Sequence, residues 1–160
     1  MRVTVLSDTH GLLRPEVVRE ARGSDLILHA GDVGDPAVLE ELGRLGPVRA
    51  VRGNVDVTGE LRRLPEAVEG DLDGVVYRMT HRREDVPGEW FRESGLVVVG
   101  HSHRPELEWR SGCLLLNPGA VGKRRFKLPL TLARLTVREG RLIPEIVAVD
   151  FKKTSPDDTP

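Results

Sequence analysis

The segment LVVVGHSHRP, residues 96–105, decides which kind of fold the chain is expected to form. Its apolar residues predict a short buried strand, and Gly100 marks the end of that strand. Two histidines, His101 and His103, follow at once, whereas a buried strand ordinarily ends in turn residues. Imidazoles in this position favour a site that holds them.

Other apolar runs of the chain end in similar side chains. Each of four further strand-like runs leads into carboxylate, amide or imidazole groups: Asp8 and His10 after RVTVL, Asp32 after LILHA, Asn54 after VRAV, and His81 after VVYRM. Because the carboxyl ends of parallel strands meet along one edge of an α/β sheet, these side chains can converge without being neighbours in sequence. The sequence therefore predicts a metal site at the strand ends.

Glycines precede three of these candidate ligands, Asp32, Asn54 and His101. A residue without a Cβ lets the backbone bend sharply and approach a bound group closely. In an extended segment residues i and i+2 point the same way, so each Asp-x-His or His-x-His pair is expected to face the site together. One such pair alone is more often a capped turn or a solvated loop, and only the combination of five strand ends indicates a metal site.

Strands and helices alternate in the first half of the chain, with helical patterns over residues 14–23 and 35–46 and Asp35 as the expected cap of the second helix. This order predicts parallel strands joined by crossover helices. A short helix is expected near residues 88–94, and three antiparallel hairpins are expected to turn at Asp73 and Gly74, Ser111 and Gly112, and Glu139 and Gly140. We therefore predict an α/β fold with two mixed sheets over residues 1–151, forming a single domain, and a disordered tail over residues 152–160.

Composition limits the possible partners. The chain has 24 Lys and Arg against 25 Asp and Glu, a net charge of −1, and only 4% aromatic residues. That balance argues against general binding to nucleic acid or to an acidic membrane. The single cysteine, Cys113, excludes an internal disulfide, and no apolar run reaches the length of a membrane span. We expect a soluble, cytoplasmic protein, whose oligomeric state the sequence leaves open.

The ordered motifs DTH, GD, GN, a histidine after a strand, and GHSH resemble those of the calcineurin-like metallophosphoesterase superfamily, and most of all its small bacterial phosphodiesterases. The resemblance extends to about residue 150. It implies a four-layer α/β/β/α sandwich, in which two mixed sheets lie between outer helices. It also implies hydrolysis of phosphodiester bonds by a hydroxide held between two divalent metal ions.

The resemblance assigns ligands position by position. Three residues would hold one metal, three the other, and one would bridge both: Asp8, His10 and His103; Asn54, His81 and His101; and Asp32. Imidazoles with carboxylate and amide oxygens suit manganese, which is expected first, or iron, zinc or nickel. The implied substrate is a small phosphodiester, with nucleotide-like diesters among the candidates. A phosphomonoesterase and a non-catalytic protein-binding scaffold of the same fold are the alternatives.

The sequence departs from the family pattern in two places. Val55 follows Asn54 where many members carry a histidine thought to protonate the leaving group, so esters with basic leaving groups are expected to react poorly. Arg82 and Arg83 follow His81 where relatives have glycine and histidine. These arginines either point to solvent or bind a substrate phosphate.

Four further features of the sequence bear on the site or on the fold. Asp56 either orients a ligand or caps a turn, and His29 is expected in the core or behind a metal ligand rather than as a ligand itself. The NPGA motif at residues 117–120 resembles a turn typical of the family and is interpreted as a marker of the fold. The basic loop at residues 122–127 either contacts an anionic substrate or is a solvated surface.

Overall fold

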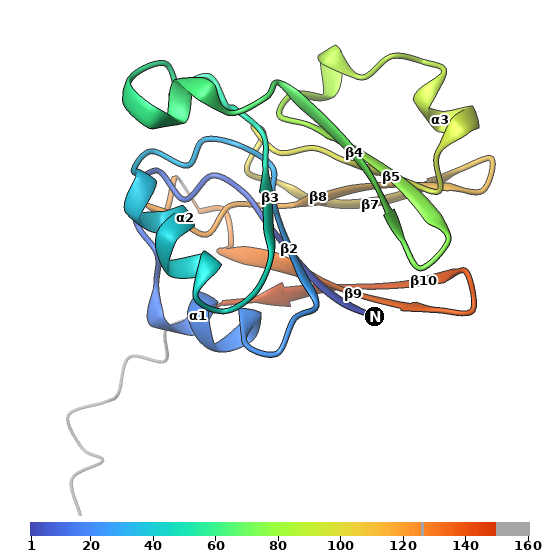
Figure 1. Ribbon diagram of the computed structural model, residues 1–160, viewed down its shortest axis with the longest axis horizontal. Coiled ribbons are helices and arrows are strands. Elements are labelled where there is room, and N and C mark those ends of the chain that lie inside the picture. The colour runs from blue at the N-terminus through green and yellow to red at the C-terminus, as the bar shows by residue number, and fades with distance from the viewer. Residues whose placement is uncertain (126, 150–160) are drawn as a thin grey trace, which may run out of the picture.

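Two five-stranded mixed sheets pack face to face in the computed structural model, which describes residues 1–125 and 127–149 (Figure 1). The first sheet has the strand order β10-β9-β1-β2-β3. Its strands are β1 (Arg2–Leu6), β2 (Leu26–His29), β3 (Val48–Ala50), β9 (Thr131–Arg138) and β10 (Arg141–Ala148). Strands β1, β2 and β3 are parallel, and β9 and β10 complete the sheet as an antiparallel hairpin.

The second sheet has the strand order β4-β5-β6-β8-β7. Its strands are β4 (Ala67–Leu72), β5 (Val75–Thr80), β6 (Leu96–Val98), β7 (Pro105–Arg110) and β8 (Cys113–Pro118). Strands β5, β6 and β8 are parallel, while β4 and β7 pair antiparallel at the two edges. Both sheets are thus mixed, as the sequence predicts.

All three predicted hairpin turns are confirmed. The two turn residues have positive φ angles in each hairpin: 48° and 91° at Asp73 and Gly74, 48° and 84° at Ser111 and Gly112, and 50° and 73° at Glu139 and Gly140. Positive φ at both central residues matches the right-handed twist of the flanking strands, and a glycine at the second position adopts it readily. These short turns fix the register of the antiparallel pairs.

The α-helices lie where the sequence places them: α1 (Pro15–Ala21), α2 (Pro36–Gly43) and α3 (Trp90–Glu93). The Asp35 carboxylate caps α2 by accepting a hydrogen bond from the Ala37 amide (2.9 Å), as predicted. Two 3₁₀-helices, η1 (Gly59–Arg63) and η2 (Arg83–Asp85), were not predicted. Within the described residues, no helix has the length and apolar character needed to cross a membrane.

Three layers of buried side chains hold the fold together. The largest lies between the sheets and includes Val5, Leu28, Met79 and Leu116. A second lies between α1, α2 and the outer face of the first sheet. A third packs Trp90 and neighbouring apolar residues on the outer face of the second sheet. Because each sheet is covered on its outer face by helices, the predicted four-layer sandwich is confirmed.

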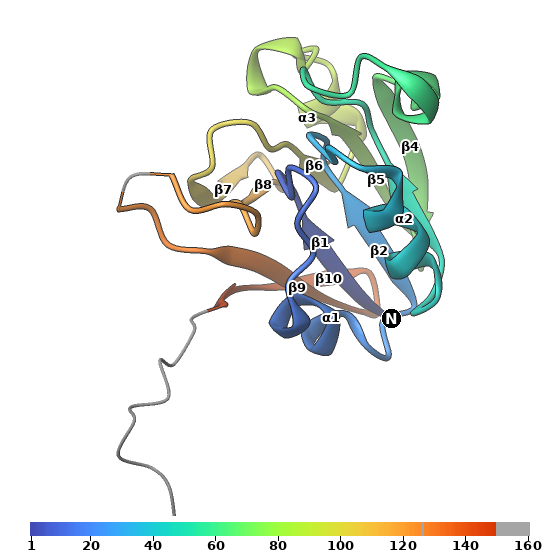
Figure 2. The ribbon, with the colours of Figure 1, turned by 90° about the vertical axis from the view of Figure 1, so that its left-hand side faces the viewer.

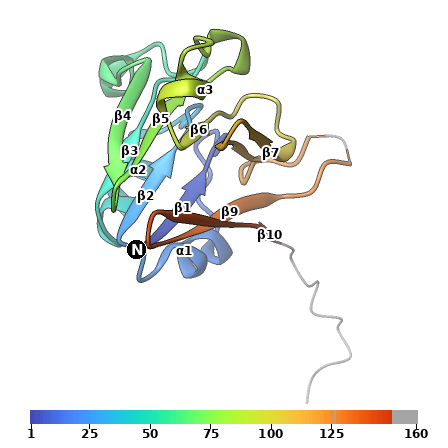
Figure 3. The same ribbon diagram turned by 90° about the vertical axis from the view of Figure 1, so that its right-hand side faces the viewer.

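The sandwich brings strand ends from both sheets to one edge. The loops after β1, β2 and β6 lie near one another in two views of the molecule (Figures 2 and 3). The His101 amide, after β6, donates a hydrogen bond to the Asp8 carboxylate, after β1 (3.1 Å). This contact joins the two sheets where the predicted ligands lie. Residues 150–160, including the predicted tail, lie outside the described residues.

Candidate metal centre

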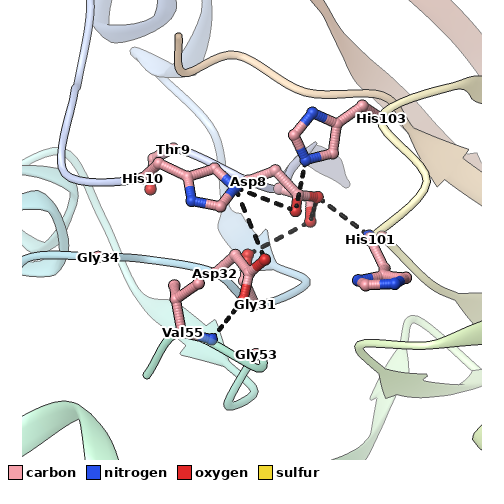
Figure 4. Close-up of polar contacts among 12 residues, drawn as sticks. Asp8, Thr9, His10, Gly31, Asp32, Gly34, Gly53, Val55, His101 and His103 are labelled. Carbon is pink, nitrogen blue, oxygen red and sulfur yellow. Dashed lines mark hydrogen bonds and ion pairs between the residues drawn. The ribbon is translucent and has the colours of Figure 1, made fainter. Parts of the chain in front are cut away.

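Two groups of three possible ligands lie at this edge of the sandwich. Each group has its ligand atoms within 4.8 Å of one another: Asp8, His10 and His103 in the first, and Asp32, His81 and His101 in the second. Figure 4 shows His10 and His103 approaching Asp8, with Asp32 beside them. The structure therefore brings six of the seven predicted ligands into two adjacent clusters.

The seventh predicted ligand, Asn54, lies against the second cluster. Its Oδ1 atom is 2.9 Å from His81 Nε2 and 3.1 Å from His101 Nδ1. The Asp32 carboxylate lies between the clusters, with Oδ2 3.3 Å from His81 Nε2 and 3.6 Å from His10 Nε2. Asp32 is therefore positioned as the sequence expects of a shared ligand.

The backbone at the ligands is left-handed rather than extended. Five of the seven predicted ligands have positive φ angles: Asp8 (57°), His10 (46°), Asp32 (55°), His101 (68°) and His103 (61°). The expected extended conformation is therefore wrong, but both residues of each pair still reach the site. Asp8 and His10 join the same cluster, whereas His101 and His103 join different clusters. Such residues cost on the order of 1 kcal/mol each and persist only where the surroundings hold them.

The glycines before the ligands permit close approach, as predicted. A Cβ on Gly53 would overlap with the Asp32 backbone and carboxylate, and one on Gly100 would overlap with Ser7 Oγ. A Cβ on Gly31 would lie 2.5 Å from His81 Nδ1. Real Cβ atoms do not approach this closely. These positions accept only glycine without a shift of the ligand loops.

The carboxylates at the centre are held in their ionised form. Burial by itself raises the pKa of Asp8, but contacts with His10, His103 and Ser7 outweigh burial and hold that pKa below its ordinary value. Ser7 Oγ donates to Asp8 Oδ2 at 2.6 Å. The pKa of Asp32 is also below its ordinary value. Burial raises this pKa, but contacts with His81 and the Val55 amide outweigh burial. Both groups therefore present negative charge to the site.

At one imidazole, that of His81, the surroundings raise the pKa. Burial would lower the pKa of His81, but the Asp32 carboxylate and the Ala30 carbonyl raise it above its ordinary value. His81 Nδ1 donates to the Ala30 carbonyl oxygen at 2.7 Å. That bond fixes the ring so that Nε2 faces Asn54 and Asp32.

The donor set fits divalent metal ions. Asp8 Oδ1 and His10 Nε2 are buried and have no hydrogen-bond partner among the described residues, and they lie 3.7 Å apart. Buried polar atoms without partners are costly unless a bound group satisfies them. Four imidazoles with two carboxylates and an amide match the preferences of manganese, iron, zinc and nickel.

Asp56 supports two of the ligand loops at once. Its carboxylate is buried and accepts hydrogen bonds from the amides of Val33 (3.1 Å), Gly34 (3.0 Å) and Gly53 (2.9 Å). It thereby ties the loop after Asp32 to the loop before Asn54. The structure resolves the two interpretations of Asp56 in favour of orienting the ligands.

His29 lies in the core behind the centre, as expected. Its Nδ1 atom accepts a hydrogen bond from the Gly31 amide (3.2 Å), so Nε2 carries the proton and donates to Thr9 Oγ1 (3.0 Å). Thr9 Oγ1 donates in turn to the Val33 carbonyl (2.8 Å). This chain of bonds links the loops after β1 and β2 and leaves His29 no free atom for a metal.

Asn117 is a supporting residue that sequence reasoning missed. Its Nδ2 donates to the Gly100 carbonyl and to Ser102 Oγ, both at 3.0 Å, and so holds the loop that carries His101 and His103. The NPGA motif therefore does more than mark the fold. The available signal in the sequence was a polar residue, Asn117, directly after the apolar run at residues 113–116 of the same strand.

A cavity of about 710 Å³ opens beside Asn54 and His81. Arg82 lines this cavity, whereas Arg83 lies in ion pairs with Glu106 (2.8 Å) and Glu108 (3.0 Å). The two arginines that the sequence treats together therefore have different surroundings.

The basic loop begins on the other side of the centre. The Gly122 amide donates to the Asp8 carbonyl at 3.1 Å, and Lys123 and Arg125 are exposed. The loop thus starts beside a predicted ligand, and the side chains of Lys123 and Arg125 face solvent.

Comparison with known proteins agrees with this geometry. A sequence profile of the calcineurin-like phosphoesterase superfamily domain matches residues 1–140. A probable metallophosphoesterase of Methanothermobacter thermautotrophicus is 34% identical over an alignment of 162 positions, gaps included. The alignment covers 92% of each protein.

Solved structures share the fold. An archaeal protein described as a novel phosphodiesterase has a TM-score of 0.73 at 21% identity, over 92% of this chain and all of that one. Vps29 of Chaetomium thermophilum has a TM-score of 0.75 at 15% identity, over 92% of this chain and 95% of that one.

The buried His29 makes the stability of the metal-free protein depend on pH. Burial lowers the pKa of His29 to about 4 from 6.5, so between these values the unfolded chain binds more protons than the folded one. The contribution is full above pH 6.5 and is lost as the pH falls toward 4, by about 2 kcal/mol between pH 7 and pH 5. Urea unfolding at both pH values, with His29→Gln for comparison, measures it. An equal pH dependence in both proteins contradicts the assignment.

Replacing Asp56 is expected to loosen the centre. Asp56→Asn places an amide group opposite backbone donors and leaves at least one of three buried N–H groups unpaired, which costs about 2 kcal/mol of unfolding free energy. Zinc affinity, measured by titration, is expected to fall about tenfold. Asp35→Asn is the matched control, because asparagine also caps helices well. The same loss in both variants would show that Asp56 has no special role.

Proposed function

The chain belongs to the calcineurin-like phosphoesterase superfamily, and from this we propose that it is a phosphodiesterase that works with two divalent metal ions. The observation that carries the proposal is the pair of adjacent ligand clusters, which the Asp32 carboxylate of the second cluster joins by its approach to His10 of the first. Phosphoester hydrolysis by two metals needs this kind of arrangement, in which two ions share a ligand.

The proposed ligands follow the two clusters: Asp8, His10 and His103 for one ion, Asn54, His81 and His101 for the other, and Asp32 for both. Manganese is proposed first, with iron, zinc or nickel as alternatives, because the donors mix imidazole with oxygen. When bound, such ions acidify water and stabilise negative charge on a phosphoryl group.

The chain's own residues orient the reaction. The Val55 amide donates to Asp32 Oδ1 at 3.1 Å and fixes that carboxylate between the clusters. Asn54 is neutral, so the second cluster carries less negative charge than an acid in its place would give it. This difference favours the anionic transition state of phosphoryl transfer.

The Val55 side chain supplies no proton. It is 41% exposed and lies next to the centre, where an acid could reach a leaving group. The leaving group of the substrate must then depart largely without protonation by this loop.

Preference for a diester rests on two supports. The motifs resemble those of small phosphodiesterases, and an archaeal protein described as a phosphodiesterase shares the fold. The proposed substrate is a small diester, nucleotide-like in character. The proposed compartment is the cytoplasm, because the single cysteine, Cys113, is a free thiol that a reducing compartment keeps reduced. A phosphomonoesterase is the second candidate, because the same clusters would hold a monoester.

Loss of the shared carboxylate is expected to abolish hydrolysis. With manganese bound, the protein should hydrolyse bis(4-nitrophenyl) phosphate faster than 4-nitrophenyl phosphate, and Asp32→Asn should lower kcat/KM for the diester at least a hundredfold, since a charge that holds both ions is lost. Asp73→Asn, an exposed change that keeps a favourable hairpin turn, serves as the control.

The same assay decides among the alternatives. Faster monoester hydrolysis would favour the phosphomonoesterase. No hydrolysis of either ester by protein shown to bind two metal ions would favour the scaffold.

The rate is expected to depend on the leaving group. Diphenyl phosphate should react much more slowly than bis(4-nitrophenyl) phosphate, because phenoxide leaves poorly without a proton donor. Val55→His should raise the diphenyl phosphate rate about tenfold and change the nitrophenyl rate little. Thr58→His places a histidine on the same loop and should have no such effect. Equal rates for the two esters in the unaltered protein would contradict this account.

A further inference from the structure

The cavity beside the metal centre is bounded by the two 3₁₀-helices that the sequence did not predict and by the predicted helix α3. Arg62 comes from η1, Arg82 immediately precedes η2, and Trp90 begins α3. Asn54 and His81 form the end of the cavity that belongs to the metal centre. A ligand whose reacting group lies at the centre would therefore extend between η1 and α3. At about 710 Å³ the cavity has the size of a nucleotide-binding site.

Several arginines near the cavity or on the second sheet are paired with carboxylates. Four are held in this way: Arg52 by Glu66, Arg78 by Glu69 and Glu93, Arg83 by Glu106 and Glu108, and Arg110 by Glu108. Their guanidinium groups already have anionic partners. They support the surface of the second sheet and offer little to a ligand.

Arg62 and Arg82 differ from these four. Across residues 1–125 and 127–149, no carboxylate lies within ion-pair distance of the Arg62 guanidinium, and Arg62 is exposed. Arg82 Nη1 lies 3.9 Å from Glu84 Oε1, which is too far for a hydrogen bond. Both side chains line the cavity, so their N–H groups are available there.

The charge of the cavity favours an anion. Of its two acidic residues, Glu66 is bound to Arg52, which leaves Asp85 against Arg62 and Arg82. Guanidinium groups bind phosphate oxygens with charge-assisted, often bidentate, hydrogen bonds. Trp90 adds an apolar side chain to the lining of the same cavity.

We propose that the substrate carries a second phosphate group, bound by Arg62 and Arg82, while its diester lies at the metal centre. This inference rests on the proposed phosphodiesterase function and specifies its substrate class. A nucleotide-like diester with an additional phosphate satisfies it, because one end is anionic and the part between the two phosphates contacts Trp90. Arg62 and Arg82 are then specificity residues, and Arg83 is a structural ion-pair residue.

The kinetic test uses two substrates that differ by one phosphate. These are thymidine 5′-(4-nitrophenyl phosphate) and the same compound with a 3′-phosphate. The unaltered protein should show a KM about tenfold lower for the 3′-phosphorylated compound. Arg62→Ala and Arg82→Ala should each remove most of that difference in KM.

Two further variants separate specific contacts from general charge. Asp85→Asn removes the opposing carboxylate and should lower the KM of the 3′-phosphorylated compound further. Arg92→Ala removes an exposed positive charge of α3 that does not line the cavity, and it should leave the preference intact. A preference that Arg92→Ala reduces as much as Arg62→Ala would overturn the proposal.

A binding test does not depend on catalysis. Trp109→Phe leaves Trp90 as the single tryptophan, so its fluorescence reports on the cavity. Thymidine 3′,5′-bisphosphate should quench it in metal-free protein, with affinity about tenfold above that of thymidine 5′-phosphate, and Arg62→Ala should abolish the difference.

The two tests distinguish two kinds of failure. Hydrolysis of bis(4-nitrophenyl) phosphate with no preference for the second phosphate overturns this inference alone. Absence of hydrolysis from metal-loaded protein overturns the proposed function, and equal quenching by both nucleotides then overturns the binding site as well.

Discussion

The rest of the structure depends on the contacts that satisfy the buried Asp8 carboxylate. It lies at the end of the first sheet and accepts hydrogen bonds from Ser7 and from the His101 amide of the second. Its remaining oxygen faces His10 and His103. A buried charge is tolerated only with partners, and loss of such partners typically costs 3–5 kcal/mol. The sheets must therefore meet so that imidazoles surround this carboxylate, and that same arrangement forms one half of the metal centre.

Strain at the ligands follows from this requirement. Asp8, Asp32 and His101 have left-handed backbones because sharp turns are needed to direct side chains from different strands at one point. The strain persists because buried hydrogen bonds hold the turns: Asp56 fixes two ligand loops and Asn117 fixes a third. A site held in this way is organised before any ligand binds, which limits the reorganisation that binding or reaction requires.

The sequence predicts the parts of the fold that depend on local chemistry. The turn at Asp73 and Gly74, the helix cap Asp35 and the glycines before the ligands are all determined by residues close in sequence. The seven proposed ligands could be predicted because each follows an apolar run. The left-handed turns, η1 and the role of Asn117 were not predicted, and the sequence left two roles open for Asp56. The contacts that decide the roles of Asp56 and Asn117 include partners that lie 15 to 23 residues away along the chain. No periodicity in the sequence reports such contacts.

The proposed selection of substrates has two causes: the centre has no proton donor at position 55, and the adjacent cavity has two arginines. Val55 provides no proton donor, so the centre cannot assist a poor leaving group through that position. Binding energy from a part of the substrate remote from phosphorus can still accelerate the reaction when it aligns the reacting groups. The guanidinium groups of Arg62 and Arg82 lie in the cavity that adjoins the centre and can supply that energy. Under the proposed function, the enzyme would discriminate among diesters by their second anionic group more than by the ester that it cleaves.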